Sequence, residues 1–272
     1  MCFFILKAKL RWGHEKVKII PLANIAMKYN IWRNKRRIMY PIAFPILKNI
    51  ANIEHAFFLE REPSGEVMTF ADKSGLSWPK PVELKQVHGN RIIKIDKRPK
   101  HTLQGDGIIT DTDIPISISV ADCAPVYLID AESRAVGLLH CGWKPISKNI
   151  IDKGAKLMNK FYGIQPEDLI AFIGPTILHD DYEIGDEIIH HFDVTNIVRN
   201  NGNIFLDIPG EIVSRLENLG IDPENIAYFP VSTFSDNTLT SYRREGHGVG
   251  RMVACLRLMQ PAAELIEEPV AV

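Results

Sequence analysis

A cysteine and a histidine flank two apolar runs in the middle of this 272-residue chain. Cys123 precedes the run at 124–129, and His140 closes the run at 135–139. Both runs are short and bounded by polar or turn residues, as buried strands are, and the link at 130–134 has the length of a hairpin loop. Since an antiparallel pair places the start of one strand beside the end of the other, we expect Cys123 and His140 to lie close together.

A thiol beside an imidazole has three ordinary explanations. The pair can bind a metal ion, or it can act as a nucleophile with its base. It can also be a buried thiol next to a hydrogen-bonded histidine, because free cysteine is among the most buried residue types. These two residues alone leave all three explanations open.

Composition sets broad limits. With 46% hydrophobic residues, the chain can bury a sizeable core in one large domain or two small ones. The four cysteines, at positions 2, 123, 141 and 255, do not form a spaced disulfide framework. The apolar surroundings of Cys123 and Cys141 suit reduced thiols, so we expect a cytoplasmic protein. No apolar run approaches the length of a transmembrane helix, and we expect no membrane partner.

The charge is unevenly distributed. Residues 1–40 hold ten Lys and Arg against one acid, which gives +9, and the remainder holds 22 basic and 32 acidic residues, which gives −10. The acidic body argues against nucleic-acid binding. We expect 1–40 to be a basic extension, disordered or upstream of the true start, before a domain at 41–260 and a tail at 261–272. A targeting peptide, or a nucleic-acid or membrane arm built on 33–37, is the alternative for the extension.

The rest of the pattern is that of a mixed α/β domain. Strands are expected at 53–59, 114–120, 168–173 and 225–229, two strands around a Gly-Asn turn at 82–95, and helices at 146–161, 186–192 and 207–219. The last helix should begin at Asp207 as its cap, with Pro209 in the first turn, and end at Gly220. Residues 249–258 fit a strand or a helix. Strands outnumber helices and many connections are tight, which predicts mixed sheets.

Six motifs in order carry a family resemblance. They are QVHG at 86–89, GDGIITD at 105–111, ADCAP at 121–125, LLHCGWK at 138–144, IGP with YEIGDE within 173–187, and SYRREG with GR within 241–251. Together they resemble the family long labelled multicopper polyphenol oxidoreductase, or laccase-domain protein, over most of the chain. One motif would be weak evidence, but six in order are highly specific.

The resemblance implies a four-layer α/β/β/α sandwich with mixed sheets in a single domain. It also implies a purine nucleoside enzyme that phosphorolyses inosine, adenosine and methylthioadenosine with inorganic phosphate and deaminates adenosine. The implied metal is zinc, held by His88, Cys123 and His140. The implied partners are small-molecule nucleosides, and we expect a monomer or small homo-oligomer.

The chemistry of these residues agrees with that implication. Two imidazoles and one thiolate suit zinc and leave a fourth tetrahedral position open, as in catalytic sites. A hydroxide at that position could attack the purine in deamination. Phosphorolysis needs an anchored phosphate, and Arg243, Arg244 and Arg251 have the fork geometry that binds one. Surface ion pairs are the alternative role for each arginine.

Several polar and aromatic residues have two possible roles. Asp122 can be a general base or can orient an imidazole, and it can also cap a turn. Asp106 offers the same choice inside a Gly-Asp-Gly turn. Gln86 can contact purine or sugar, or it can be a solvated strand residue. Trp143 and Tyr182 can stack on the base or belong to the core.

The chain departs from the family pattern after two of its motif residues. The family usually has a small residue after the second ligand histidine, where this chain has Cys141, and Arg-Gly after the tryptophan, where it has Lys144 and Pro145. Cys141 should point to the opposite face of its strand from His140. Lys144 keeps the charge but loses bidentate geometry, and Pro145 fits the start of a helix.

Three other functions compete with the zinc nucleoside enzyme. A copper-dependent polyphenol oxidase would need clustered imidazoles, but the chain has nine His and no His-x-His pair. A Cys–His hydrolase would use Cys123 as nucleophile and His140 as base, which leaves His88 without a role. A structural zinc module fits less well, because three ligands leave the site open.

Overall fold

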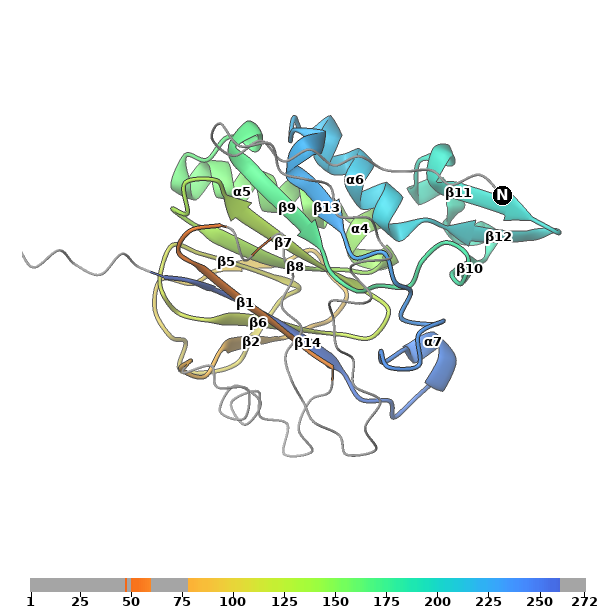
Figure 1. Cartoon of the computed structure of the whole chain (residues 1–272), viewed down its shortest axis with the longest axis horizontal. Coiled ribbons are helices and arrows are strands. Elements are labelled where there is room, and N and C mark those ends of the chain that lie inside the picture. The colour runs from red at the N-terminus through yellow and green to blue at the C-terminus, as the bar shows by residue number, and fades with distance from the viewer. Residues whose placement is uncertain (1–46, 48–49, 60–77, 260–272) are drawn as a thin grey trace, which may run out of the picture.

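The computed structural model describes residues 47, 50–59 and 78–259. They form a single mixed α/β domain in which two large sheets stack face to face and helices cover the outer side of one of them (Figure 1). The fold class that we expected is thereby confirmed. The described residues do not test the expected fourth layer, and the basic extension and the boundaries near 40 and 260 lie outside them.

The six-stranded sheet carries the predicted hairpin. Its order is β13 (Ile226–Tyr228), β9 (Leu169–Ile173), β7 (Ala124–Asp130), β8 (Val136–Cys141), β5 (Gly107–Thr110) and β3 (Ile92–Lys94). β7 and β8 pair antiparallel with Pro125 opposite His140, whereas the outer pairs β13–β9 and β5–β3 are parallel. The sheet is therefore mixed, as the strand pattern predicted.

The second sheet has five strands in the described part of the chain. Its order is β1 (Ile53–Phe58), β14 (Met252–Leu258), β6 (Ile116–Val120), β2 (Val82–Lys85) and β4 (Leu103–Gln104). Residues 249–258, which fitted a strand or a helix, form strand β14. Both strands predicted within 82–95 exist, but β2 belongs to this sheet and β3 to the other. The Gly-Asn turn therefore carries the chain between sheets.

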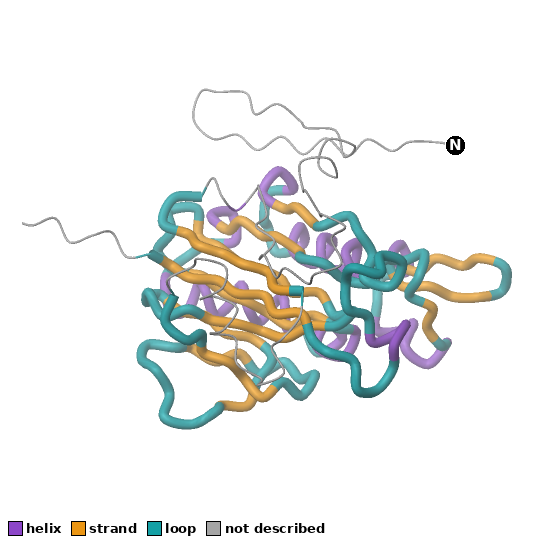
Figure 2. Tube along the Cα trace, turned by 60° about the horizontal axis from the view of Figure 1, so that its bottom comes forward, coloured by secondary structure: helices purple, strands orange, loops and turns teal. Residues whose placement is uncertain are grey.

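A small sheet projects from the main body of the domain (Figures 1 and 2). The sequence patterns did not predict it. It has the order β10 (Glu183–Ile184), β12 (Asn203–Leu206) and β11 (Ile197–Asn200), with antiparallel pairing throughout. Asn201 and Gly202 join β11 to β12 with φ of 50° and 84°. An Asn-Gly pair with two positive φ angles is the favoured two-residue hairpin turn, so a signal was present.

The helices pack mainly on the six-stranded sheet. They are α4 (Trp143–Ser147), α5 (Ile150–Tyr162), α6 (Ile208–Asn218) and α7 (Tyr242–Glu245), with short 3-10 helices η1 (Pro166–Asp168), η2 (Asp186–His191), η3 (Val194–Asn196) and η4 (Pro223–Asn225). The helix expected at 146–161 is interrupted by Asn149, whose φ is 60° and whose Oδ1 accepts a hydrogen bond from Arg215 of α6 at 2.7 Å. Asp207 caps α6 as predicted, because its Oδ1 accepts from the Gly210 amide at 3.0 Å.

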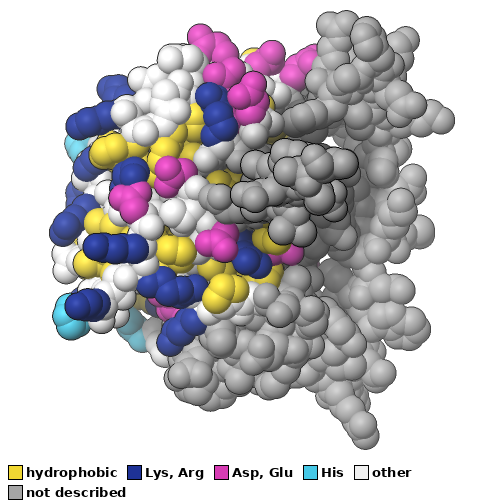
Figure 3. All heavy atoms as spheres, turned by 90° about the vertical axis from the view of Figure 1, so that its left-hand side faces the viewer, with side chains coloured by type: hydrophobic (Ala, Val, Ile, Leu, Met, Phe, Trp, Pro, Cys, Tyr) yellow, Lys and Arg dark blue, Asp and Glu magenta, His cyan; other side chains and the backbone are white. Residues whose placement is uncertain are grey.

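The described surface in Figure 3 is not dominated by either positive or negative charge. Basic, acidic and apolar side chains are interspersed there among the described residues. No helix within 78–259 combines the length and the apolar character that crossing a bilayer requires. The expected absence of nucleic-acid and membrane partners stays a prediction.

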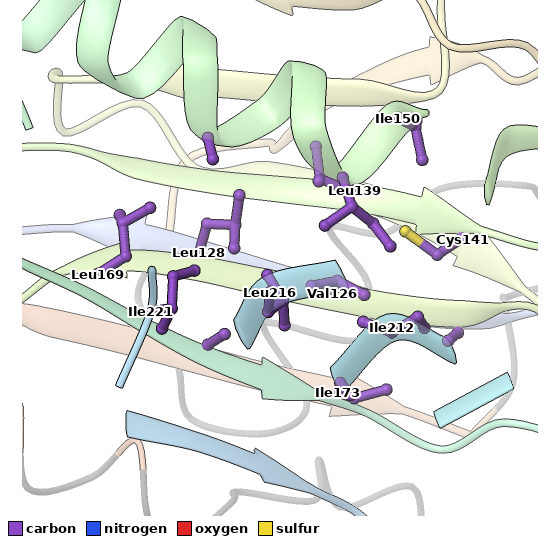
Figure 4. Close-up of a cluster of buried hydrophobic side chains, with 14 of the residues drawn as sticks. Val126, Leu128, Leu139, Cys141, Ile150, Leu169, Ile173, Ile212, Leu216 and Ile221 are labelled. Carbon is purple, nitrogen blue, oxygen red and sulfur yellow. The ribbon is translucent and has the colours of Figure 1, made fainter. Parts of the chain in front are cut away.

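The core has two main layers. Alternate residues of β7 face opposite ways, so that Val126 and Leu128 pack toward α5 and α6 (Figure 4) while Tyr127 and Ile129 pack toward the five-stranded sheet. The same alternation places buried Cys141 in the helix-side layer. Cys141 is thus directed away from His140, as we expected.

Connections between the two large sheets gather at one end of the sandwich. Because β2, β4 and β6 are parallel, all three end there, and the chain crosses to the other sheet at 86–91, 105–106 and 121–123. β8 also ends there, and the connection 229–251 crosses back to begin β14. Residues far apart in sequence therefore meet at this end.

Candidate metal centre

Three of the predicted site residues converge at the end of the sandwich where the connections between the two large sheets gather. The ligand atoms of His88, Cys123 and His140 all lie within 4.8 Å of one another, and the two imidazole rings meet edge to face. His140 is buried, Cys123 is half-buried and His88 is exposed, so the cluster opens to solvent on the His88 side. The expected proximity of Cys123 and His140 is confirmed.

Asp106 holds the turn that presents His88. Its carboxylate accepts hydrogen bonds from the backbone amides of His88 at 2.9 Å and Gly89 at 2.7 Å, and from that of Val87 at 3.2 Å. His88 has a φ of 55°, which a side chain tolerates only when its surroundings hold it. Burial by itself would raise the pKa of Asp106, but His140 and the turn amides keep that pKa below its ordinary value. The carboxylate therefore stays ionised.

The same carboxylate orients His140. Oδ1 of Asp106 lies 3.0 Å from Nδ1 of His140, and a carboxylate can only accept, so Nδ1 carries the proton. Nε2 is then the ring nitrogen that faces away from Asp106 and can bind a metal once its proton leaves. A histidine whose second nitrogen donates to a carboxylate is the usual arrangement around protein-bound metals. Of the roles that the sequence left open for Asp106, the contacts support two, because it orients His140 and also accepts from the amides of the turn.

The cluster favours a thiolate. Burial would raise the pKa of Cys123, but the charges and hydrogen bonds of His140 and His88 outweigh it and lower that pKa to about 6. Burial would likewise lower the pKa of His140, yet the Cys123 thiolate and Asp106 raise it to about 9. Thiolate is the form of cysteine that binds metal ions.

The donor set fits zinc with three protein ligands. It is the one group of three or more convergent His, Cys, Asp or Glu side chains within the described residues. Gly142 makes room for it, because a Cβ at that position would lie only 2.5 Å from Sγ of Cys123. One thiolate and two imidazoles with an open fourth position match a catalytic zinc site.

Gly142→Ala should therefore weaken zinc binding. We expect the added methyl group to displace Sγ and raise the Kd for zinc by about 10- to 100-fold, the range for changes beside a metal's ligands. Competition with a chromogenic chelator measures this. Gly250→Ala is the matched control, since a Cβ there meets nothing within 4 Å. Equal Kd values for the two variants would contradict the prediction.

Asp122 lies beside the cluster and faces away from bulk water. It is 9% exposed, has a φ of 77° and immediately precedes Cys123. Oδ1 accepts from Oγ1 of Thr233 at 2.6 Å, and Oδ2 accepts from the backbone amide of Arg243 at 2.6 Å. The predicted catalytic residues Asp122 and Arg243 are thus in direct contact through the main chain.

Arg243 presents an exposed guanidinium near the cluster. Its Nη1 donates to the carbonyl of Glu183 at 2.9 Å, and the guanidinium lies 5.1 Å from the centre of the Tyr182 ring. Burial and the Cys123 charge raise the pKa of Tyr182, while Arg243 lowers it, so the ring lies within electrostatic reach of both. Tyr182 also packs against the helix-side core.

The other predicted substrate residues have their polar atoms engaged with backbone. Arg244 donates to several carbonyls of the loop 233–239, and Arg251 donates to two carbonyls of its own loop. The Gln86 side-chain amide pairs with the backbone N–H and C=O of Ser119, each at 2.8 Å, which continues the pairing of β2 with β6. Their contact with substrate stays a prediction.

Lys148 contacts the turn that holds His88, and Lys144 lies beside Trp143. Lys144 lies 5.3 Å from the Trp143 ring centre, and Trp143 packs partly against the core. Lys148 donates to the carbonyl of His88 at 3.3 Å, and its own carbonyl accepts from Asn90. The sequence patterns gave no signal for Lys148, because its contacts with His88 and Asn90 join segments that are distant in sequence.

Two relatives are similar to this chain in sequence. A purine nucleoside phosphorylase from Clostridium acetobutylicum is 30% identical over 175 residues, which cover 62% of this chain and 73% of that protein. One from Aquifex aeolicus is 32% identical over 161 residues, which cover 59% and 74%. The name purine nucleoside phosphorylase belongs to these two relatives.

Solved structures share the fold. The crystal structure of the hypothetical protein YfiH from Bacillus licheniformis superposes with a TM-score of 0.71 at 22% identity, over 85% of this chain and all of that one. YlmD from Geobacillus stearothermophilus gives a TM-score of 0.71 at 20% identity, over 84% of this chain and 98% of the other. The family model described as multi-copper polyphenol oxidoreductase laccase matches residues 66–259. The chain therefore belongs to that family.

Proposed function

We propose that this protein is a zinc-dependent purine nucleoside phosphorylase that converts inosine, adenosine and methylthioadenosine to free base and sugar 1-phosphate and also deaminates adenosine. The cluster of His88, Cys123 and His140, which opens toward solvent, is the observation that carries the proposal. The names of the relatives from Clostridium and Aquifex support phosphorolysis. Zinc, deamination and the range of nucleosides rest on the donor chemistry and the resemblance.

Each residue of the centre has a distinct task in this proposal. His88, Cys123 and His140 would hold the zinc, and Asp106 keeps a proton on Nδ1 of His140, so that Nε2 is the nitrogen that would bind it. When bound, zinc supplies Lewis acidity and lowers the pKa of water in its open position from 15.7 to about 7. Hydrolytic deamination of adenosine, in which an oxygen from water replaces the amino group and ammonia leaves, would draw on that chemistry.

Phosphorolysis places different demands on the chain. A phosphate oxygen attacks the anomeric carbon of the sugar while the bond to the base breaks, so phosphate must be bound and aligned. Arg243 has an exposed planar fork, and its contact with Tyr182 limits the orientations that the guanidinium can adopt. Arg244 and Arg251 hold the surrounding loops, and Gln86 holds the strand that leads to His88.

Chromatography of reactions with and without phosphate tests the proposal. The zinc-loaded protein should release base from inosine or adenosine only when phosphate is present, with sugar 1-phosphate as co-product. Arg243→Ala should raise the KM for phosphate, whereas Arg199→Ala, at an exposed position on β11, serves as the matched control. Base release that ignores phosphate would refute the phosphorylase assignment.

A Cys–His hydrolase is the second candidate, because the low pKa of Cys123 beside His140 also suits a nucleophile and its base. In that case His88 is a bystander and chelators have no effect on activity. In the zinc enzyme, loss of His88 removes metal and activity together. A copper oxidase is less well supported, because the described residues contain a single convergent donor group.

Alkylation of Cys123 separates these two candidates. In zinc-free protein we expect the rate of iodoacetamide labelling to rise with pH and reach half its maximum near pH 6, because thiolate is the reactive form. Zinc should protect the thiolate and slow labelling at all pH values. Mass spectrometry locates the label, and Cys141→Ala should label equally, since Cys141 is buried with a raised pKa. A fully active zinc-free protein that alkylation inactivates would favour the hydrolase.

A further inference from the structure

Asp122 joins two parts of the site that come from distant segments. We infer that Asp122 is a positioning residue that fixes Arg243 relative to Cys123, and that it is not the general base of the reaction. This inference rests on the proposed function, because it gives Arg243 the role of binding phosphate. It changes the role that residue type alone suggested for Asp122.

The side chain of Asp122 is committed to two short hydrogen bonds. Oδ1 accepts from the Thr233 hydroxyl and Oδ2 from the Arg243 amide, each at 2.6 Å. Both donors belong to the connection between β13 and β14, which is more than a hundred residues away in sequence. A carboxylate with both oxygens so engaged in a buried position is a fixed acceptor for this connection.

The main chain of Asp122 is anchored on the opposite side. Its carbonyl accepts from Oγ1 of Thr176 at 2.6 Å and from the amide of Ile177 at 3.1 Å, just after β9. These bonds hold the residue at a φ of 77°, a conformation that aspartate tolerates better than most residues. The backbone thus fixes the turn that presents Cys123, and the carboxylate fixes a different segment to that turn.

The segment that donates hydrogen bonds to the Asp122 carboxylate includes Arg243, the proposed phosphate-binding residue. Arg243 donates its amide to Asp122 near the start of α7, and its guanidinium leaves the helix toward Tyr182. Ser241 caps the same helix by accepting from the Arg244 amide at 3.2 Å. The guanidinium of Arg244 ties α7 to the loop 233–239. Asp122 is therefore the contact through which α7 is held to the Cys123 turn.

Asp122→Asn tests the inference, because it keeps the size of the side chain while removing the carboxylate charge and one of the two acceptor oxygens that hold Thr233 and Arg243. We expect the Kd for inorganic phosphate, measured by calorimetry on the zinc-loaded protein, to rise about tenfold, which corresponds to the loss of one charge-assisted hydrogen bond. The KM for phosphate should rise similarly, while zinc content, the KM for nucleoside and the pH profile of kcat stay unchanged. Adding Arg243→Ala should cause little further loss.

Thr233→Val is the second variant, in case Asp122→Asn does not fold. It removes only the partner of Oδ1 and should raise the Kd for phosphate about threefold, the size of a neutral hydrogen bond. Arg199→Ala is the control for both variants.

Kinetics and binding give separate answers. A loss of kcat by Asp122→Asn with unchanged phosphate binding and a lost limb of the pH profile would identify a general base and overturn the inference. If wild-type protein binds phosphate but does not phosphorolyse nucleosides, the proposed function fails, and a raised Kd in Asp122→Asn still supports the positioning role. A wild-type protein that binds no phosphate overturns both.

Discussion

Alanine at His88, Cys123 or His140 will remove zinc and lower kcat/KM for phosphorolysis by roughly a thousandfold or more, as expected when a catalytic metal is lost. Each residue offers one of three donor atoms within 4.8 Å of one another, so each variant keeps only two of the proposed ligands. Elemental analysis and a base-release assay on the same preparation measure both effects. His101→Ala is the matched control, because His101 is exposed in the loop before β4.

His88→Ala is the most informative of the three variants. It leaves the contact between His140 and Asp106 in place, so a Cys–His pair would keep its geometry. Loss of zinc together with full retention of activity would reverse the ranking of the two proposed functions. Retention of zinc in all three variants would place the metal elsewhere.

Asp106→Ala will lower both the stability of the fold and the affinity for zinc. The substitution leaves the turn amides at 87–89 without their buried acceptor and frees the His140 ring. We expect the free energy of unfolding to fall by about 3–5 kcal/mol, the cost of removing one partner from a buried charged network. The Kd for zinc should rise about 10- to 100-fold.

Urea denaturation of metal-free protein and chelator competition separate these two effects. Asp180→Ala is the control, because the Asp180 side chain is 86% exposed. A lower stability with an unchanged Kd for zinc would mean that Asp106 supports the turn and not the ligand. Unchanged stability would contradict the role assigned to the three amides.

The part of the site that follows from local pattern was predictable. Two apolar runs with a hairpin link define β7 and β8, and their pairing brings Cys123 near His140. The position of His88 could not be predicted from local pattern, because a Gly-Asn turn does not reveal which sheet each flanking strand joins. His88 entered through the resemblance, whereas its place in space depends on β2 and β3 lying in different sheets.

Roles assigned by residue type were harder to predict. A guanidinium can bind phosphate or hold a loop, and the sequence does not say which carbonyls will fold against it. Arg244 and Arg243 are neighbours, yet the first donates to several loop carbonyls while the second remains exposed. The helix break at Asn149 was not predictable either, and Asn149 there accepts a hydrogen bond from Arg215, which is distant in sequence.

The crossings between the two sheets affect how the protein unfolds. His88, Asp106 and Cys123 each lie where the chain passes from one sheet to the other, and His140 lies at the end of a strand. The three ligands therefore come together only when the sheets have stacked, which is a late event because it depends on contacts distant in sequence. We therefore expect a metal bound there to stabilise the native state more than the folding transition state. Metal binding should slow unfolding, which lengthens the lifetime of the folded protein, and should leave the refolding rate nearly unchanged.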